Sequence, residues 1–269
     1  MEYDWRPVMQ QVVCRFQQEL GENLVGIYLH GSAAFGCVGE GSDLDFIAVV
    51  QNPPLPLQRQ NLIRSLMELE AQAPRKGIEM SAVLLQHCVQ FSYPTPYQLH
   101  YSPMYRAAYQ QDMASCCRRM QGVDYDLAAH FTVIRKVGIV LCGKPIEEVF
   151  GEVPWEAYLD SIDRDIIDAE QSVCCCPLDT TLNLCRVLAA ARAGLVLSKE
   201  QGARWALEQM PQYSALLAEA LYCYGAGRTF CWDVGELKRF ATAVLDQIHG
   251  EMLKVGFGTE YNEGKKTDR

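Results

Sequence analysis

The sequence predicts an α/β (α+β) domain with a mixed sheet, followed by an all-α helical-bundle domain. Apolar strand-like runs alternate with helical periodicity through roughly the first 155 of the 269 residues, and long helical patterns fill the remainder. Glycine and proline residues gather at 143–154, just before this change, which is typical of a domain boundary. We therefore expect one domain at 1–155 and a second at 156–269.

The first domain is predicted to begin with a helix and two strands. Apolar residues recur every three or four positions over 3–20, which indicates an amphipathic helix that ends at Gly21. The stretches 24–32 and 43–50 are rich in β-branched and aromatic residues, which favours two strands. A glycine-rich loop joins these strands.

A further helix and strand follow in the first domain. Helical periodicity returns over 59–72, after a proline-rich stretch. The sequence IEMSAVLL at 78–85 predicts a third strand. Successive side chains of a strand point to opposite faces, so Ile78 and Met80 should share one face and Glu79 should lie on the other.

The second domain is predicted to be entirely helical. Its helical patterns cover 156–173, 181–197, 203–210, 213–224 and 234–255. The apolar stripe that includes Leu182 and Leu188 is expected to face the core of this bundle.

Composition narrows the classes of function. The formal net charge of -9 disfavours nucleic acid as a partner, because phosphate binding needs clustered Lys and Arg. An acidic protein would instead attract a cationic small molecule. No apolar run reaches the ~20 residues that span a bilayer, and the N-terminus lacks the pattern of a signal peptide. We expect a cytoplasmic protein, a monomer or weak oligomer, that does not bind membranes.

The twelve cysteines do not predict a metal site. No pair has C-x-x-C spacing, and Cys174, Cys175 and Cys176 are adjacent residues that point in different directions on any regular element. Scattered free thiols are the expected state in a reducing compartment.

The residues that predict chemistry lie between the first two strands. Gly31 and Ser32 form a turn, and ten residues separate Ser32 from Asp43 in the sequence D-L-D. Residues two apart on a strand face the same way, so Asp43 and Asp45 should present their carboxylates together. Magnesium relieves the repulsion of such a pair and is commonly shared with substrate phosphates. A glycine turn lets backbone N–H groups approach those phosphates.

This segment resembles the signature of the nucleotidyltransferase superfamily, which has a polymerase-β-like core. The wider chain is similar to the aminoglycoside 3''-adenylyltransferase (streptomycin/spectinomycin adenylyltransferase) family. The stretches that carry the resemblance are HGSAAFGCVGEGSDLDFIAVV, GKPIEEVFGEVP, LNLCRVLAAARAGLVLSKEQGARWALEQMP and the closing helices.

The resemblance implies a role for each matching residue. Asp43 and Asp45 would be catalytic and bind Mg²⁺, with two ions expected, and Glu79 would be the base that deprotonates the acceptor hydroxyl. The residues that would bind the nucleotide, ATP, are Gly31, Ser32, Ser42, Arg186, Lys199 and Tyr224.

The acceptor side departs from the family pattern. Met104 stands where the antibiotic-modifying enzymes carry a tryptophan, and methionine lacks a flat aromatic face. Asp179 is the carboxylate close before the second-domain motif TLNLCR. Met104 and Asp179 are the candidate acceptor-binding residues.

We expect an enzyme, a magnesium-dependent nucleotidyltransferase that transfers AMP from ATP to a hydroxyl of a small, cationic acceptor. The expected acceptor is aminoglycoside-like, of the streptomycin or spectinomycin type, as in antibiotic resistance. The helical domain would close over the nucleotide and substrate. One alternative keeps the chemistry but uses a non-antibiotic or protein acceptor. Another is a non-catalytic nucleotide-binding regulatory module, although such a module needs no third carboxylate at Glu79.

Overall fold

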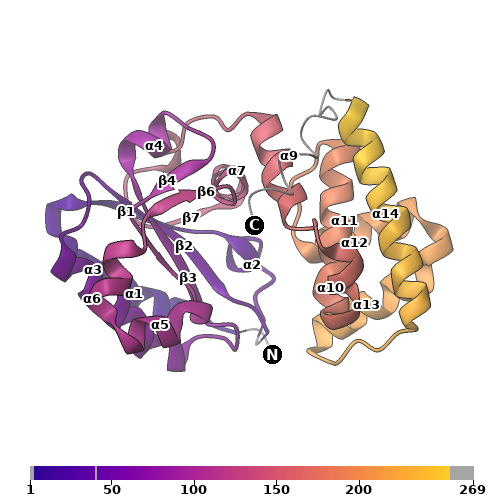
Figure 1. The fold of residues 1–269 in the computed structure, drawn as a ribbon, viewed down its shortest axis with the longest axis horizontal. Helices are drawn as coiled ribbons and strands as arrows, with labels where there is room; N and C mark the ends of the chain where they lie inside the picture. Colours follow the sequence, from indigo (N-terminus) through magenta and orange to yellow (C-terminus); the bar gives the residue numbers. More distant parts are fainter. Residues whose placement is uncertain (1–2, 40, 255–269) are drawn as a thin grey trace. The chain divides into compact units, whose positions relative to one another are not determined.

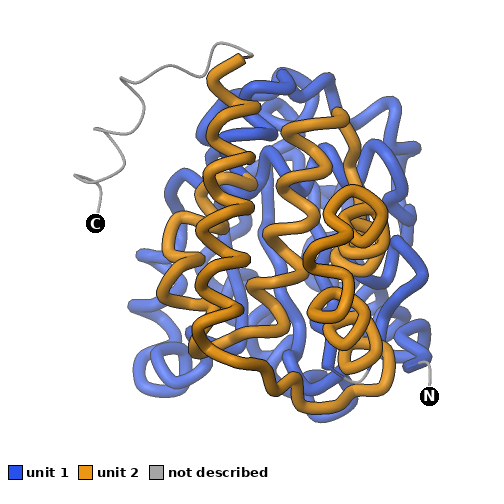
Figure 2. The backbone as a smooth tube through the Cα atoms, turned by 90° about the vertical axis from the view of Figure 1, so that its right-hand side faces the viewer, with its two compact units in different colours: residues 1–161 blue, residues 162–269 orange. Residues whose placement is uncertain are grey.

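The chain divides into two compact units, residues 1–161 and 162–269 (Figure 2). The computed structural model describes residues 3–39 and 41–254. The division falls inside helix α9, Trp155–Arg164. Unit 1 holds a mixed sheet with helices, and the described residues of unit 2 (162–254) form helices without strands, which confirms the predicted fold class.

Unit 1 contains a five-stranded mixed sheet in the order β5-β3-β2-β1-β7 (Figure 1). The β2–β3 pair is parallel, and the β1–β2, β1–β7 and β3–β5 pairs are antiparallel. The strands are β1 Leu24–Leu29, β2 Leu44–Val50, β3 Ile78–Leu84, β5 Leu99–Tyr101 and β7 Ile139–Gly143. A second, two-stranded sheet pairs β4 Thr95–Tyr97 with β6 Gly122–Asp124.

The helices of unit 1 connect these strands and cover the sheet. They are α1 Arg6–Leu20, α2 Gly31–Ala34, α3 Pro56–Leu69, α4 Leu85–Val89, α5 Arg106–Gln111, α6 Met113–Arg119, α7 Leu127–Val137 and α8 Ile146–Val149. Short 3₁₀ turns lie at η1 Gly21–Asn23, η2 Glu70–Gln72 and η3 Pro103–Tyr105. The sequence predicted α1, α3 and the first three strands, but not the elements between Leu85 and Val149.

The two faces of the large sheet are buried under different helices. Even-numbered residues of β2 and β3, such as Phe46 and Met80, pack in one hydrophobic cluster with residues of α1 and α3. Odd-numbered residues, such as Ile47 and Val83, pack in a second cluster with residues of α7. Glu79 is odd-numbered and lies on the α7 face, as the alternation of the strand predicted.

Unit 2 is a group of helices that lie side by side (Figure 1). They are α10 Ala169–Cys175, α11 Pro177–Ala193, α12 Lys199–Gln209, α13 Ser214–Ala226 and α14 Val234–Lys254, with the 3₁₀ turn η4 Pro211–Tyr213. Helix α11 is central, since it contacts α10, α12, α13 and α14. Its Leu182 and Leu188 are fully buried, which confirms the predicted apolar stripe.

The helix predicted over 156–173 is wrong, because the chain breaks it into α9 and α10. Residues 165–168 form a turn, with i to i+3 bonds such as Ile166 N–H to the Asp163 carbonyl at 3.2 Å. Aspartates recur through this segment, and their side chains compete with helical backbone bonding. Helix α11 begins at Pro177, four residues before the predicted start at 181, because proline is tolerated in a first turn.

Within residues 3–39 and 41–254, no helix is both long and apolar enough to cross a membrane. The same part of the chain holds no group of three or more His, Cys, Asp or Glu side chains arranged to bind a metal ion. The twelve cysteines are free thiols.

Candidate active site

The turn after β1 is built on a glycine that no other residue could replace without strain. Gly31 has a φ of +62°, in the left-handed region. A Cβ atom at Gly31 would lie 2.0 Å from Oδ2 of Asp45. The preceding residue, His30, donates its backbone N–H to the Asp45 carbonyl at 2.9 Å. This hydrogen bond joins the turn to strand β2, and the Asp45 carboxylate lies against the Gly31 backbone.

The hydroxyl of Ser32 is a polar atom without a protein partner. Its Oγ is buried and makes no hydrogen bond within the described part of the chain. A buried hydroxyl normally finds a partner, so an unsatisfied one next to a glycine turn indicates a place for a ligand oxygen. The Ser32 carbonyl is used internally, since it accepts the backbone N–H of Cys37 at 3.0 Å.

Ser42 fixes the loop that leads into β2. Its Oγ accepts the backbone N–H of Gly39 at 3.0 Å, and its own N–H donates to the Gly39 carbonyl at 3.0 Å. Its carbonyl accepts the N–H of Lys76 at 3.2 Å. Because Oγ acts here as an acceptor, the hydroxyl proton can still be donated to a phosphate.

Two carboxylates stand side by side on the α7 face of the sheet, and a third directly precedes β2. Asp43 and Asp45 come at the beginning of β2, two residues apart, and all three side chains are half-buried. Asp45 stands opposite Glu79 in the parallel β2–β3 ladder. Neighbouring strands are about 4.8 Å apart, so Asp45 and Glu79 are adjacent on one surface. The structure thus brings together the carboxylates that the sequence proposed for metal binding and for the base.

Two histidine rings contact each other at the turn that follows β1. His30 is buried and its ring lies 4.5 Å, centroid to centroid, from that of His130 on α7. Burial lowers the pKa of His30 well below its ordinary value, and the nearby His130 lowers it further. His30 is therefore neutral at neutral pH and adds no positive charge to the turn.

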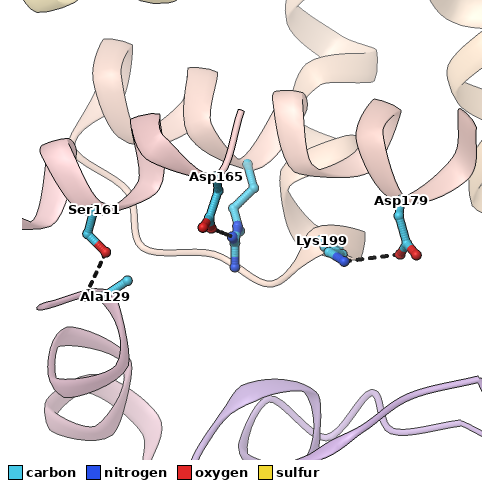
Figure 3. Close-up of polar contacts among 6 residues, drawn as sticks. Ala129, Ser161, Asp165, Asp179 and Lys199 are labelled. Atoms are coloured by element: carbon cyan, nitrogen blue, oxygen red, sulfur yellow. Dashed lines mark hydrogen bonds and ion pairs between the residues drawn. The ribbon is translucent and has the colours of Figure 1, made fainter. Parts of the chain in front are cut away.

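In unit 2, Arg186 is held by an ion pair. Its Nη2 lies 3.2 Å from Oδ2 of Asp165 (Figure 3). Its Nε is buried and has no hydrogen-bond partner in the part of the chain that the structure describes. A Cβ atom at Gly202 would lie 2.7 Å from the Arg186 Cα, so α11 and α12 pack closely at this point. Gly202 is the residue that permits this approach.

Lys199 and Asp179, which the sequence assigned separately to nucleotide and acceptor, form an ion pair. Lys199 Nζ donates to Asp179 Oδ1 at 3.0 Å, between α12 and the first turn of α11 (Figure 3). Both side chains are partly exposed. Tyr224 is half-buried on α13. In unit 1, Met104 is 77% exposed in η3, so its thioether is available at the surface.

The residues of unit 1 fit a magnesium ion that is shared with a ligand. Mg²⁺ is usually held by one or two protein carboxylates plus substrate phosphates and waters. Asp43 and Asp45 supply that number of carboxylates, and the unpartnered Ser32 hydroxyl lies at the same turn.

Comparison with known proteins finds similarity to one family of enzymes. A family model described as the C-terminal domain of aminoglycoside adenylyltransferases matches residues 148–247. The aminoglycoside (3'')(9) adenylyltransferase of Klebsiella pneumoniae is 24% identical over 255 residues, covering 92% of this chain and 94% of that protein. Over most of its length the chain is thus similar to aminoglycoside adenylyltransferases, and this similarity supports an enzyme of the nucleotidyltransferase class.

Two further proteins of this kind are similar to the chain. The spectinomycin 9-adenylyltransferase of Staphylococcus aureus is 24% identical over 203 residues, covering 74% of this chain and 76% of that protein. A crystal structure of a spectinomycin adenyltransferase from Enterococcus faecialis, with ATP and spectinomycin, matches with a TM-score of 0.78. The match covers 91% of this chain and 100% of that one at 18% identity, and it confirms the fold.

Sequence reasoning missed a polar group beside Glu79. Ser81 lies two residues along β3, on the same face, and its Oγ is 3.0 Å from Nδ1 of His100 on β5. Rings of Tyr97 and Tyr105 flank His100, with centroids 6.1 and 5.6 Å away. The alternation that placed Glu79 also places Ser81 on this face, but the pairing of β5 with β3 is not readable from the sequence.

Proposed function

We propose that this chain transfers AMP from magnesium-bound ATP to a hydroxyl of an aminoglycoside-like acceptor, of the streptomycin or spectinomycin type. The adenylyltransferases to which it is similar support this reaction. The structural relative from Enterococcus faecialis holds ATP and spectinomycin, which supports both the nucleotide and the class of acceptor.

The observation that carries the proposal is the pairing of Asp45 with Glu79. In the β2–β3 ladder these two residues are register partners. One carboxylate beside the glycine turn can hold the metal of the triphosphate, while its neighbour accepts a proton from the attacking hydroxyl. A non-catalytic nucleotide-binding module would have no use for the second group.

Asp43 and Asp45 would hold Mg²⁺, which supplies positive charge to the triphosphate when bound. The Gly31 turn and the hydroxyls of Ser32 and Ser42 would orient the phosphate oxygens. The absence of a Cβ at Gly31 leaves the space that the Asp45 carboxylate occupies against this turn. These groups fix the α-phosphorus in reach of the acceptor.

The chemical step is a displacement at that phosphorus. The acceptor oxygen forms a bond to the α-phosphorus, and the bond from this phosphorus to the bridging oxygen of the β-phosphate breaks. AMP is transferred and pyrophosphate leaves. Glu79 accepts the hydroxyl proton as the new bond forms, which is the role of a general base.

The family resemblance implies that Arg186, Lys199 and Tyr224 of unit 2 also bind the nucleotide. Two of these side chains, Arg186 and Lys199, form ion pairs with Asp165 and Asp179. Phosphate oxygens carry more charge than a carboxylate, so the guanidinium and ammonium groups can exchange partners when ATP arrives. The partly exposed pair of Lys199 and Asp179 would open more readily.

Pyrophosphate release from ATP and Mg²⁺, measured across streptomycin, spectinomycin and other hydroxylated cations, tests the proposal. We expect release that depends on one acceptor, with a product heavier than the acceptor by one AMP group in mass spectrometry. Asp45→Asn should abolish release, whereas Glu22→Gln, at an exposed position, should leave it unchanged. Binding of magnesium ATP without release for every acceptor would contradict the proposed reaction and favour the regulatory module.

A further inference from the structure

The candidate base, Glu79, has a different strand on each side of it in the sheet. Glu79 lies on β3, between β2 and β5 in the sheet. The turn and carboxylates proposed for the nucleotide lie on β1 and β2. The acceptor hydroxyl must reach Glu79 without displacing the nucleotide, so the remaining side of Glu79, over β5, is the direction from which the acceptor comes.

The residue on β5 that reaches this face is His100. Its ring bonds Ser81, which shares the face of β3 with Glu79. Two residues along a strand span about 6.6 Å and one strand spacing adds about 4.8 Å sideways. The backbone of His100 is thus about 8 Å from that of Glu79.

One nitrogen of the His100 imidazole is available to hydrogen-bond a ligand. Nδ1 is engaged by Ser81 at 3.0 Å, and Nε2 has no hydrogen-bond partner in the part of the chain that the structure describes. Burial lowers the pKa of His100, although nearby Asp124 opposes that effect. The ring is therefore neutral at neutral pH and can hydrogen-bond a hydroxyl without repelling a cationic acceptor.

The surroundings of His100 suit a hydroxylated ring with an amino substituent. Half-buried rings of Tyr97 and Tyr105 stand on either side of the imidazole and offer apolar surface. The carboxylate of Asp124, on β6, is close enough to raise the pKa of both Tyr97 and His100. A positively charged amino group would be attracted by that carboxylate.

We propose that His100 binds the acceptor, with Nε2 hydrogen-bonded to a hydroxyl near the one that Glu79 deprotonates. The rest of this acceptor-binding site consists of Tyr97, Tyr105 and Asp124. Ser81 orients the imidazole. The inference rests on the proposed function and adds the residues that select the acceptor. It also explains why an exposed methionine at position 104 suffices, since the aromatic surface comes from the tyrosines.

The test is steady-state kinetics of His100→Ala, His100→Gln and the matched control His87→Ala, with spectinomycin and streptomycin as probes. We expect His100→Ala to raise the KM for the acceptor about 10-fold, the value of one lost hydrogen bond. Its KM for ATP should stay within about 2-fold of wild type. His100→Gln keeps a hydrogen-bonding side chain, so its KM for the acceptor should lie between those of His100→Ala and wild type. His87→Ala should match wild type in both KM values.

An unchanged acceptor KM in His100→Ala, or an equal rise in the KM for ATP, would overturn the inference. Thermal melting of each variant separates these outcomes from misfolding, and His100→Gln then carries the test if His100→Ala does not fold. If wild type transfers no AMP, the proposed function fails, and calorimetric titration with spectinomycin decides the inference separately. Weaker binding to His100→Ala than to wild type would support it, and no binding to wild type would overturn it.

Discussion

Asp45 and Glu79 stand opposite each other in the parallel β2–β3 ladder, on the face of the sheet that α7 covers. Asp45 also lies over Gly31, where a Cβ atom would be 2.0 Å from its Oδ2. One carboxylate is therefore fixed between the glycine turn and the second carboxylate. We propose that Asp45 binds the metal and that Glu79 acts as the base.

Gly31→Ala should remove activity and lower stability. The left-handed φ of +62° costs a residue with a Cβ about 1–2 kcal/mol, and the new methyl group would displace the Asp45 carboxylate. Gly36→Ala is the matched control, because φ is +71° there but nothing lies within 4 Å of the Cβ position. Thermal melting should show a loss in both variants. AMP transfer should fall only in Gly31→Ala, and equal activity in the two variants would argue against a role for this contact.

Ser32→Ala should separate binding from stability. Its hydroxyl has no protein partner, so its removal leaves no other group unsatisfied and the free energy of unfolding should not fall. If Ser32 bonds a phosphate, the KM for ATP should rise about 10-fold. Ser92→Ala, which removes another buried hydroxyl without a partner, should leave the KM for ATP unchanged. A wild-type KM in Ser32→Ala would exclude the phosphate contact.

Arg186→Met should lower kcat by about 100-fold, since it removes a cation proposed to face the transferred phosphate. The ion pair with Asp165 is partly exposed, so its loss should cost less than about 1 kcal/mol of stability. Arg192→Met, farther along the same helix, also breaks an ion pair, with Glu251. That control should retain wild-type kcat. Comparable loss of activity in both variants would indicate a general effect on α11.

Stability should fall as pH drops below the ordinary histidine pKa of 6.5, because of His30. The pKa of His30 is lowered in the folded chain, so the unfolded chain takes up a proton first. The contribution of neutral His30 to stability is complete above pH 6.5. It is lost as the pH falls from 6.5 towards the lower pKa of His30 in the folded chain. Melting temperatures at about pH 7.5 and about pH 5.5 should differ more for wild type than for His30→Gln. His87→Gln should keep the wild-type difference, and an unchanged difference in His30→Gln would contradict the assignment.

Local patterns in the sequence predicted the core of the candidate site. Successive side chains of a strand point to opposite faces, so the odd residue numbers alone predict that Asp43, Asp45 and Glu79 share a face. The glycine at position 31 marks the turn. Their mutual distance was not predictable, because it depends on the pairing of β2 with β3, which are separated by helix α3.

The remaining features arise from contacts between distant segments. The stacking of His30 on His130 and the bond from Ser81 to His100 join residues that no local pattern links. The break at 165–168 was missed because the apolar spacing continues across it, while the aspartates in the turn favour non-helical bonding. Helix α7 had a usable signal in Leu127, Phe131 and Ile134, whose spacing is that of one helical face.

The central claim, that Glu79 is the base for AMP transfer, is tested most directly by Glu79→Gln under saturating magnesium ATP and acceptor. The substitution keeps size and hydrogen bonding but removes the proton acceptor. We predict that kcat falls by about 10²–10⁴-fold while the affinity for magnesium ATP is unchanged. A Glu79→Gln variant that transfers AMP to the acceptor at the wild-type rate would contradict the account.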